Sequence, residues 1–558
     1  MRMLSLWGKT MKKSKFLFGL FIPVLSGCSC SLFNAKAFSW ENYKNNSVAM
    51  SLTSEKFDSF KLDDFDLNSK KEKIQQIVTN KGSRDEFVRT YNEINYELSK
   101  IVNSYIIAST RYYASNNSTY QNRASIYYSA YLDTSKFLLS LEEDIYHSSN
   151  AIKEAYFGDL SDSQIEARLR KNKQSKLEAD YDEIFNQYQD DGQQLYSKYR
   201  NNKMGIDEYL EQGYTYLVRY ANKARELTDQ ISYDNYLDFS YNYYYSRDYK
   251  YTDADTFVNY VKQYFVPILL RKSKLTKPAN VDGDLLQYIS SYNLCNRKTN
   301  LCDVFESYAE TMGGQYLTAY NNAFKYGYYC FSDNANSMGT AYEWNLNGIN
   351  DAVLFFSRNY QDVLSVAHEF GHYYSCTQKS GVRKNDAYDL QETYSQGNEF
   401  TFCKYLLEQK QDDKDFATYN YFVDAKIYDS IQQIVNEAAI TEIEKFLYTS
   451  TNLDVDILKS TVEYILSSYG GTASRTYFMA ACLTSPCYYI SYATSLIEAL
   501  QFAALSFEDA KTTYTDLIEN CAKITMVDRW EQAGLTSPFN KQTFITLGNM
   551  FEDIGNKY

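Results

Sequence analysis

The stretch His368-Glu369-Phe370-Gly371-His372 places two of the chain's three histidines four positions apart. On an α-helix, residues at positions i and i+4 lie on one face, so both imidazoles can reach a single metal ion. Glu369 follows the first histidine and would project close enough to that ion to take a proton from a bound water. The stretch therefore predicts a metal-binding helix that carries a carboxylate base beside its ligands.

The residues before this stretch predict a strand followed by a helix. Residues 352–357, Ala-Val-Leu-Phe-Phe-Ser, are a short β-branched and aromatic run, as is typical of a strand. Residues 359–362 offer a helix N-terminus, and the apolar residues between Val363 and Phe370 would bury the helix that follows. The strand would be either a plain core strand or, with an exposed edge, a strand to which an extended peptide adds.

Two residues are candidates for a third metal ligand, since a catalytic zinc ion usually has three protein ligands and an open position for water. No histidine follows His372 in the chain. Glu392 lies in residues 389–406, which regain helical spacing after a polar, glycine-containing loop. Cys376 is the rival ligand, but a thiolate there would favour a closed, structural site. We therefore favour Glu392.

Two further acids in the segment after the loop are candidates to support the ligands. Asp389 precedes Glu392 by about one helical turn and would accept the free N–H of a zinc-bound imidazole, which would fix its tautomer. Glu399 would do similar work, or would be an ordinary solvated helix residue. Spacing alone does not decide between these two roles for Glu399.

The combined pattern resembles the oligoendopeptidase F and thimet oligopeptidase family of zinc metallopeptidases. Residues 366–372 match its HExGH pattern, and residues 392–399 match the helix in which a glutamate ligand opens an ExxS…E pattern. The segment between them is a few residues shorter than is usual, which indicates a trimmed loop. Residues 486–495 are similar to the family's Pro-Tyr-Tyr…Tyr-Ala-Thr-Gly segment, and the likeness covers roughly residues 80–555.

This resemblance implies a mainly α-helical metallopeptidase with a deep substrate channel and a small β-sheet beside the zinc helix. One Zn²⁺ per chain would be held by His368, His372 and Glu392. Glu369 would be the general base and Tyr488 would stabilise the oxyanion. The implied reaction is hydrolysis of peptide bonds in unfolded oligopeptides by a zinc-bound water, without a covalent intermediate.

One feature of the family is missing. Its members usually place a histidine a few residues before the Pro-Tyr-Tyr segment to bind the oxyanion, whereas Ala481 and Cys482 occupy that neighbourhood here. Losing one oxyanion donor typically costs about 10²–10³ in kcat. The alternative function is therefore a catalytically impaired protein that binds peptides, although the retained Glu369 favours an enzyme. A solute-binding lipoprotein would show alternating strands and helices, which this chain does not.

The N-terminus has the pattern of a bacterial lipoprotein signal. Basic residues precede an apolar run, residues 16–25, which ends in Leu25-Ser26-Gly27-Cys28. Acylation of the Cys28 thiol after cleavage would anchor the protein to the membrane on the extracytoplasmic side, at the bacterial cell surface. Removing five positive charges with this signal changes the net charge from −13 to −18, which argues against nucleic acid as a partner. No pattern indicates the oligomeric state.

The chain as a whole has the composition of a helical protein, with only 5 prolines and 22 glycines in 558 residues. A stripe at helical spacing predicts a buried helix face at Phe87, Tyr91, Ile94, Leu98, Ile101 and Tyr105. The tyrosine-rich stretch Tyr241 to Tyr251 is interpreted as a bias of composition rather than a binding site. We expect a signal peptide at 1–27, a tether at 28–55, a helical N-terminal domain at 56–200 and a zinc-bearing catalytic domain at 201–558.

Overall fold

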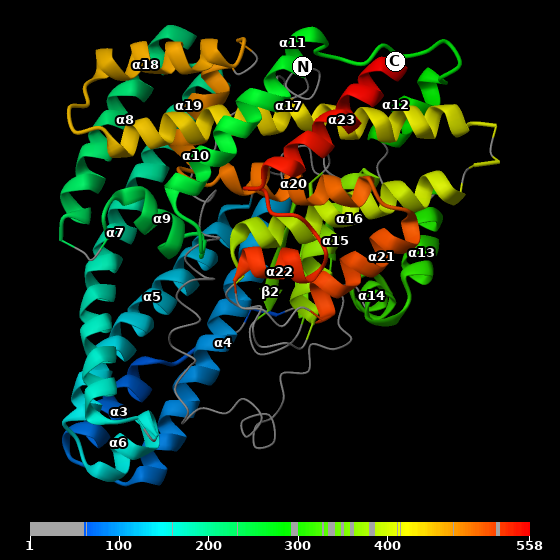
Figure 1. The fold of residues 1–558 in the computed structure, drawn as a ribbon. Helices are drawn as coiled ribbons and strands as arrows, with labels where there is room; N and C mark the ends of the chain where they lie inside the picture. Colours follow the sequence, from blue (N-terminus) through cyan, green and yellow to red (C-terminus); the bar gives the residue numbers. More distant parts are fainter. Residues whose placement is uncertain are drawn as a thin grey trace.

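The computed structural model describes residues 61–558, with gaps at 63, 116, 159, 231–232, 292–299, 326–328, 333–340, 347–350, 358–361, 379–385, 410, 413, 472–473 and 521–524. In this part of the chain the fold is mainly helical, with one small sheet (Figure 1). No helix there is long and apolar enough to cross a membrane. The predicted signal, the predicted acylation site at Cys28 and the predicted tether lie outside the described residues.

The N-terminal helices are long and pack on one another. They are α3 (Asn68–Thr79), α4 (Arg84–Ser115), α5 (Ser118–Tyr146), α6 (Asn150–Phe157) and α7 (Asp162–Arg200). The predicted stripe from Phe87 to Tyr105 lies on α4, and all six of its side chains are buried, which confirms that prediction. The domain boundary expected near residue 200 falls between the end of α7 and the next helix, and it stays a prediction.

The helices of the middle of the chain lead to the sheet. They are α8 (Ile206–Thr228), α9 (Tyr236–Tyr243), α10 (Tyr251–Tyr260), a π-helical turn (Val261–Phe265), α11 (Val266–Arg271), α12 (Gly283–Ser291), α13 (Asn300–Met312), α14 (Gly314–Tyr320) and a second π-helical turn (Asn321–Lys325). Two helices that cover residues 363–377 and 388–409 are described below. After them come α17 (Phe416–Thr449), α18 (Val455–Ser468), α19 (Arg475–Thr484), α20 (Ile490–Ala503), α21 (Phe507–Thr515), a third π-helical turn (Asp516–Asn520), α22 (Met526–Gln532) and α23 (Lys541–Lys557). In Figure 1 the long α17 crosses the upper part of the view, above α20, α16 and α15.

The sheet has three strands in the order β1-β3-β2. Strand β3 (Asp351–Phe356) pairs in parallel with β1 (Tyr329–Phe331) and antiparallel with β2 (Ala341–Leu346). Residues 352–356 of β3 are completely buried, so the predicted strand is a core strand. Because β3 is paired on both sides, a peptide cannot add to it, and the two edges of the sheet belong to β1 and β2.

Two helices cross at the centre of the molecule, α15 (Val363–Thr377) and α16 (Tyr388–Gln409). The Asp362 side chain caps α15 by accepting hydrogen bonds from the backbone N–H groups of Leu364 and Ser365. A Cβ atom at Gly371 would lie only 2.6 Å from the Tyr394 carbonyl oxygen of α16. Only glycine permits the two backbones to approach so closely, and this approach brings the histidines of α15 next to the acids of α16.

Candidate metal centre

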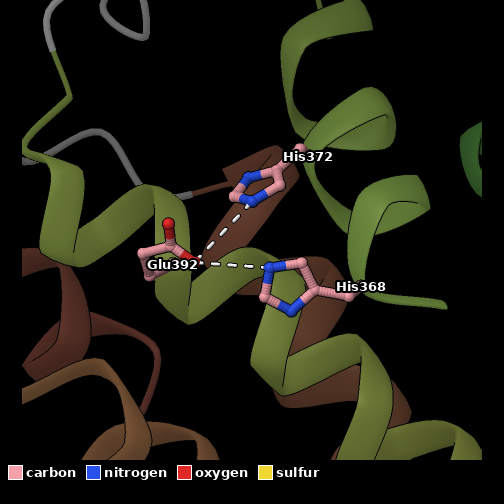
Figure 2. A group of neighbouring side chains, drawn as sticks. All are labelled: His368, His372 and Glu392. Carbon is pink, nitrogen blue, oxygen red and sulfur yellow. Dashed lines mark ion pairs between the residues drawn. The ribbon is translucent and has the colours of Figure 1, made fainter. Parts of the chain in front are cut away.

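The side chains of His368, His372 and Glu392 converge from α15 and α16 (Figure 2). Glu392 Oε2 lies 3.4 Å from His368 Nε2 and 3.8 Å from His372 Nε2. Tetrahedral zinc with bonds of about 2.1 Å would separate its ligand atoms by about 3.4 Å. The three donor atoms all lie within 4.8 Å of one another, so the group fits a zinc ion. It also leaves the fourth position free of a protein ligand from the described residues.

Cys376, the rival third ligand, lies outside this group among the residues that the structure describes. It follows His372 by one helical turn on α15, and its thiol contacts the Tyr373 carbonyl oxygen at 3.1 Å. The metal-binding group is therefore two imidazoles and a carboxylate, the ligand set of catalytic zinc sites in several peptidases.

Glu399 orients the first histidine. Its Oε1 atom lies 2.7 Å from His368 Nδ1, which leaves Nε2 of the same ring to face Glu392. Glu399 Oε2 lies 2.6 Å from Lys426 Nζ, which extends from α17. Burial alone would raise the pKa of Glu399, but Lys426 and His368 together lower it to about 2. The carboxylate is thus ionised and held between a lysine and a ligand.

The two histidines differ in their electrostatic surroundings. Burial lowers the pKa of His372 to about 4, which keeps its ring neutral and available as a ligand. Burial also acts to lower the pKa of His368, but hydrogen bonds to Glu392 and Glu399 raise it well above its ordinary value. Such surroundings favour a positive charge beside Nε2 of His368, and a metal ion would supply that charge.

Asp389 has a different role from the one expected. Its carboxylate accepts four hydrogen bonds, from Arg247 Nε (2.8 Å), Tyr249 (2.8 Å), Ser491 (2.7 Å) and Thr494 (2.7 Å). None of these donors is an imidazole, and the carboxylate is completely buried. The contact to a histidine that the sequence suggested for Asp389 belongs to Glu399 instead.

Glu369 lies on α15 directly after His368 and is 8% exposed. Burial raises its pKa to about 8, opposed by the nearby His368. A metal ion bound by the neighbouring ligands would favour the ionised form of this carboxyl, and in that form Glu369 can accept a proton from water and release it in a later step. The position of Glu369 beside a metal ligand therefore suits a general base, and the bound metal would supply the charge that ionises it.

Tyr488 lies in the turn between α19 and α20. Its hydroxyl donates a hydrogen bond to Glu392 Oε1 at 2.8 Å and lies 3.3 Å from the Tyr492 hydroxyl. Ala481 and Cys482, at the place of the family's usual histidine, are both completely buried on α19. The Tyr488 hydroxyl thus lies at a metal ligand, as does the Ser395 hydroxyl, which is 3.3 Å from Glu392 Oε2.

Sequence reasoning missed two basic residues of this region, Arg247 and Lys426. Lys426 lies on a helix with no local motif, 27 positions after Glu399, and nothing in its own spacing relates it to the metal. Arg247 lies within the tyrosine-rich stretch that was interpreted as a bias of composition. The single arginine within this run of tyrosines was the available signal, because a buried arginine needs an acidic partner.

The fold is shared with solved peptidase structures. The chain superposes on PZ peptidase A in complex with an inhibitor with a TM-score of 0.62 and 14% identity, over 90% of this chain and 99% of the other. A protein assigned as an oligoendopeptidase F from Bacillus anthracis gives a TM-score of 0.60 at 15% identity, over 91% of this chain and 99% of the other. Oligoendopeptidase F from Enterococcus faecium gives a TM-score of 0.50 at 14% identity, over 88% of this chain and 96% of the other. The sequence matches no protein-family model and no curated protein.

These superpositions and the metal-binding group define the class of protein: a large helical fold of the peptidase kind with a His-His-Glu site. Within that class, the structural similarity is to oligoendopeptidase F and PZ peptidase and extends over about 90% of the chain. At 13–15% identity this likeness shows the fold alone. The activity has to be argued from the side chains.

Proposed function

We propose that this protein is a zinc-dependent endopeptidase that hydrolyses peptide bonds in unfolded oligopeptides. The observation that carries the proposal is the convergence of His368, His372 and Glu392, with Glu369 beside the first histidine. The fold supports it, since the similar structures include PZ peptidase A with a bound inhibitor and oligoendopeptidase F. Oligopeptides rather than folded proteins, and a deep channel that admits them, follow from the resemblance to that family.

The mechanism assigns one task to each side chain. Bound zinc would supply Lewis-acid polarisation and a water of lowered pKa. His368 and His372 would hold the ion as neutral imidazoles, the ion taking the place of the Nε2 proton of His368, and Glu399 fixes the tautomer of His368 through its Nδ1 atom. Glu369 takes the proton of the attacking water and passes it to the leaving amine. No covalent bond to the protein is formed in this sequence.

The oxyanion needs a donor besides the metal, and we assign that role to Tyr488. Its hydroxyl already lies at the metal ligands, 2.8 Å from Glu392 Oε1. Burial raises its pKa well above its ordinary value, so it stays a protonated donor across the neutral pH range. In the proposed reaction this hydroxyl turns from the glutamate to the substrate oxygen and does the work of the missing histidine.

The experiment that tests this function compares the zinc-loaded protein with Glu369→Gln on a panel of quenched fluorescent peptides. Both proteins are expected to hold one zinc per chain, because Glu369 is not a ligand. The variant is expected to lose about 10²–10⁴ in kcat, the usual contribution of a general base. Removal of zinc by a chelator should abolish cleavage by the wild type, and added zinc should restore it.

A second candidate function, peptide binding without efficient turnover, is favoured by one observation. Ala481 and Cys482 provide no imidazole where related enzymes have one. Stoichiometric zinc together with cleavage no faster than that of Glu369→Gln would contradict the enzyme and leave this alternative. Peptide affinity measured by fluorescence anisotropy with the same peptides would then describe the function.

We also propose that the protein acts outside the cytoplasm, anchored by an acylated Cys28. The support is the sequence pattern of the first 28 residues. In a bacterial host, the wild type should incorporate a radiolabelled fatty acid and sediment with membranes. Cys28→Ser should do neither, and labelling of this variant would contradict the assignment.

A further inference from the structure

The turn that carries Tyr488 has an unusual backbone. It joins α19 to α20, and Cys487, next to Tyr488, has a φ angle of +63°. Left-handed backbone of this kind is unfavourable for a residue with a side chain, so the surrounding structure has to hold it. Cys487 is completely buried, which leaves protein groups rather than water to do so.

Arg247 holds this turn from one side. Its Nη1 atom donates to the Cys487 carbonyl oxygen at 2.8 Å, and its Nη2 atom donates to the Tyr488 carbonyl oxygen at 3.3 Å. Nη2 also donates to Ser491 Oγ at 2.6 Å, in the first turn of α20. The guanidinium therefore contacts the backbone carbonyl groups on both sides of Tyr488 and the start of the next helix.

Two further groups complete the hold on the turn. The Tyr245 hydroxyl donates to the Pro486 carbonyl oxygen at 2.6 Å, and Glu444 Oε1 accepts from the Cys487 N–H at 2.6 Å. Tyr245 belongs to the same segment as Arg247, and Glu444 belongs to α17. Consecutive peptide groups of the turn are thus fixed from two directions.

The same guanidinium also binds the helix of the metal ligand. Arg247 Nε donates to Asp389 Oδ2 at 2.8 Å, and both side chains are completely buried. Asp389 lies three residues before Glu392 on α16. The Tyr241 and Tyr245 rings each lie 4.5 Å from the guanidinium carbon and fix its plane. Arg247 therefore links the backbone of the Tyr488 turn to the helical turn that carries Glu392, beside the bonds that Ser491 and Thr494 donate to Asp389.

We propose that Arg247 is a positioning residue that sets the Tyr488 hydroxyl against Glu392, by binding the Tyr488 turn and the Asp389 carboxylate at the same time. The inference rests on the proposed function, which makes Tyr488 and Glu392 active groups. Arginine suits this task because four of its donors are used in one plane. A lysine has the charge but cannot reach α16 and the turn together.

The test is a double-mutant cycle on metal affinity with Arg247→Lys and Tyr488→Phe. Affinity for Zn²⁺ and Co²⁺ is measured by competition with a chelator, so the cycle needs no turnover. Loss of a group that orients a ligand usually costs 10–100-fold in metal affinity. We expect about a tenfold loss in each single variant and no further loss in the double variant. Losses that multiply in the double variant would overturn the proposal.

Arg529→Lys is the matched control for removing a buried arginine. Arg529 pairs with Asp386 just before α16 at 2.8 Å, and both side chains are nearly as buried as those of Arg247 and Asp389. The Arg529 Nη1 atom donates to Asp386 Oδ2 at 2.8 Å and to the Tyr394 hydroxyl at 3.1 Å, whereas the bonds to the Tyr488 turn described above involve Arg247, Tyr245 and Glu444. The effect of Arg529→Lys on metal affinity is expected to combine multiplicatively with that of Tyr488→Phe. A coupling as strong as that of Arg247 would show a general effect of buried charge and contradict the specific role.

A milder variant keeps the test decisive if Arg247→Lys fails to fold, which circular dichroism would show. Tyr245→Phe removes only the hydroxyl that binds Pro486, and it should be coupled to Tyr488→Phe in the same cycle. The proposal would be overturned if Arg247→Lys does not fold and the effects of Tyr245→Phe and Tyr488→Phe on metal affinity are independent. The arginine would then serve folding alone.

Kinetics separate this inference from the proposed function. If the wild type binds zinc but cleaves no peptide, the enzyme assignment fails while the affinity cycle still reports on Arg247. If the wild type cleaves peptides, Arg247→Lys should lower kcat with little change in KM, and this loss should vanish in the Tyr488→Phe background. A loss of kcat that persists unchanged in that background contradicts the positioning role and leaves the peptidase standing.

Discussion

At the scale of residues, each group of the metal centre is oriented by a partner from another element. Glu399 of α16 binds His368 of α15, and Lys426 of α17 binds Glu399. The Tyr488 hydroxyl binds Glu392. Such partners fix the ligand atoms before the metal arrives, which reduces the entropy lost on binding and raises the affinity.

Replacing Lys426 by methionine should weaken zinc binding by about tenfold, because Glu399 would lose the cation that orients its carboxylate toward His368. Lys426→Arg should recover much of the affinity, since arginine keeps the charge. The measurement is chelator competition. Lys445→Met is the control, because Lys445 lies on the same helix as Lys426 but pairs with Asp255 of α10, so this variant should leave the affinity unchanged. Equal losses in the two methionine variants would contradict the role of Lys426.

Glu444 predicts a pH dependence of stability. Burial raises its pKa to about 7, so the folded protein keeps a proton there that the unfolded chain releases near its ordinary pKa of 4.5. The contribution of Glu444 to the free energy of unfolding therefore falls as pH rises from about 4.5 to 7. At about 1.4 kcal/mol per pH unit, the loss is on the order of 3 kcal/mol.

Glu444→Gln should remove this loss, because the amide oxygen can still accept the Cys487 N–H without an ionisable group. Urea unfolding of the metal-free protein at several pH values measures the effect. The variant should gain stability relative to the wild type as pH rises through this window. A difference between the two proteins that does not change with pH would contradict a raised pKa.

Whether a contact near the metal site could be predicted depends on how far apart its two residues lie in the sequence. The grouping of His368 and His372 follows from one helical turn, so spacing alone predicts it. The role expected for Asp389 came from the same kind of local argument and was wrong. Its charged partner is Arg247, which lies 142 positions away in the sequence. Local periodicity carries no information on contacts of that range, which depend on how the helices pack.

At the scale of elements, the crossing of α15 and α16 depends on Gly371. Its Cβ position faces the backbone of α16, at 2.6 Å from the Tyr394 carbonyl oxygen and 2.7 Å from the Ser395 Cα atom. Backbone cannot rotate away as a side chain can. The separation of the two helices, and with it the distance from the histidines to Glu392, is therefore set at this residue.

Gly371→Ala should force the helices apart, lower the stability by about 1–3 kcal/mol and weaken zinc binding. Gly548→Ala on α23 is the matched control, because the nearest atom to its Cβ position is 3.9 Å away. This second change should be neutral or stabilising by up to about 1 kcal/mol, since alanine favours the helix. Thermal unfolding and chelator competition measure both effects, and a tolerated Gly371→Ala with full zinc affinity would contradict this account of the crossing.

The order of the strands shows where prediction of elements from sequence ends. The apolar run at 352–357 predicts a strand, and β3 occupies residues 351–356. The sequence could not decide between a core strand and a strand whose exposed edge accepts a peptide, because pairing with β1 and β2 depends on residues outside the run. Complete burial and two paired neighbours then identify β3 as a core strand.

At the scale of the whole molecule, the fold is preserved at an identity near 14%, while no sequence family is matched. The sparse glycine and proline and the buried stripe of α4 predict a helical protein. The path of the helices around the site comes from packing, which many different side chains can satisfy. At such low identity, the metal-ligand residues are the part of the sequence in which the resemblance can still be recognised.

Zinc should stabilise the whole fold, because its ligands come from two helices that exist only in the folded state. At a free zinc concentration of about 100 times the Kd, the free energy of unfolding should rise by about 2.7 kcal/mol. Unfolding by urea with zinc and with a chelator measures the difference. His372→Ala should abolish most of it, and a zinc effect that persists undiminished in this variant would place the bound ion elsewhere.

The zinc site itself is tested most directly by anomalous diffraction from crystals of the zinc-loaded protein, with data collected on both sides of the zinc absorption edge. We predict one anomalous peak per chain, within about 2.2 Å of His368 Nε2, His372 Nε2 and a carboxylate oxygen of Glu392. A peak bound to Cys376 in place of Glu392, or no peak between the two helices, would contradict the site on which the proposed peptidase depends.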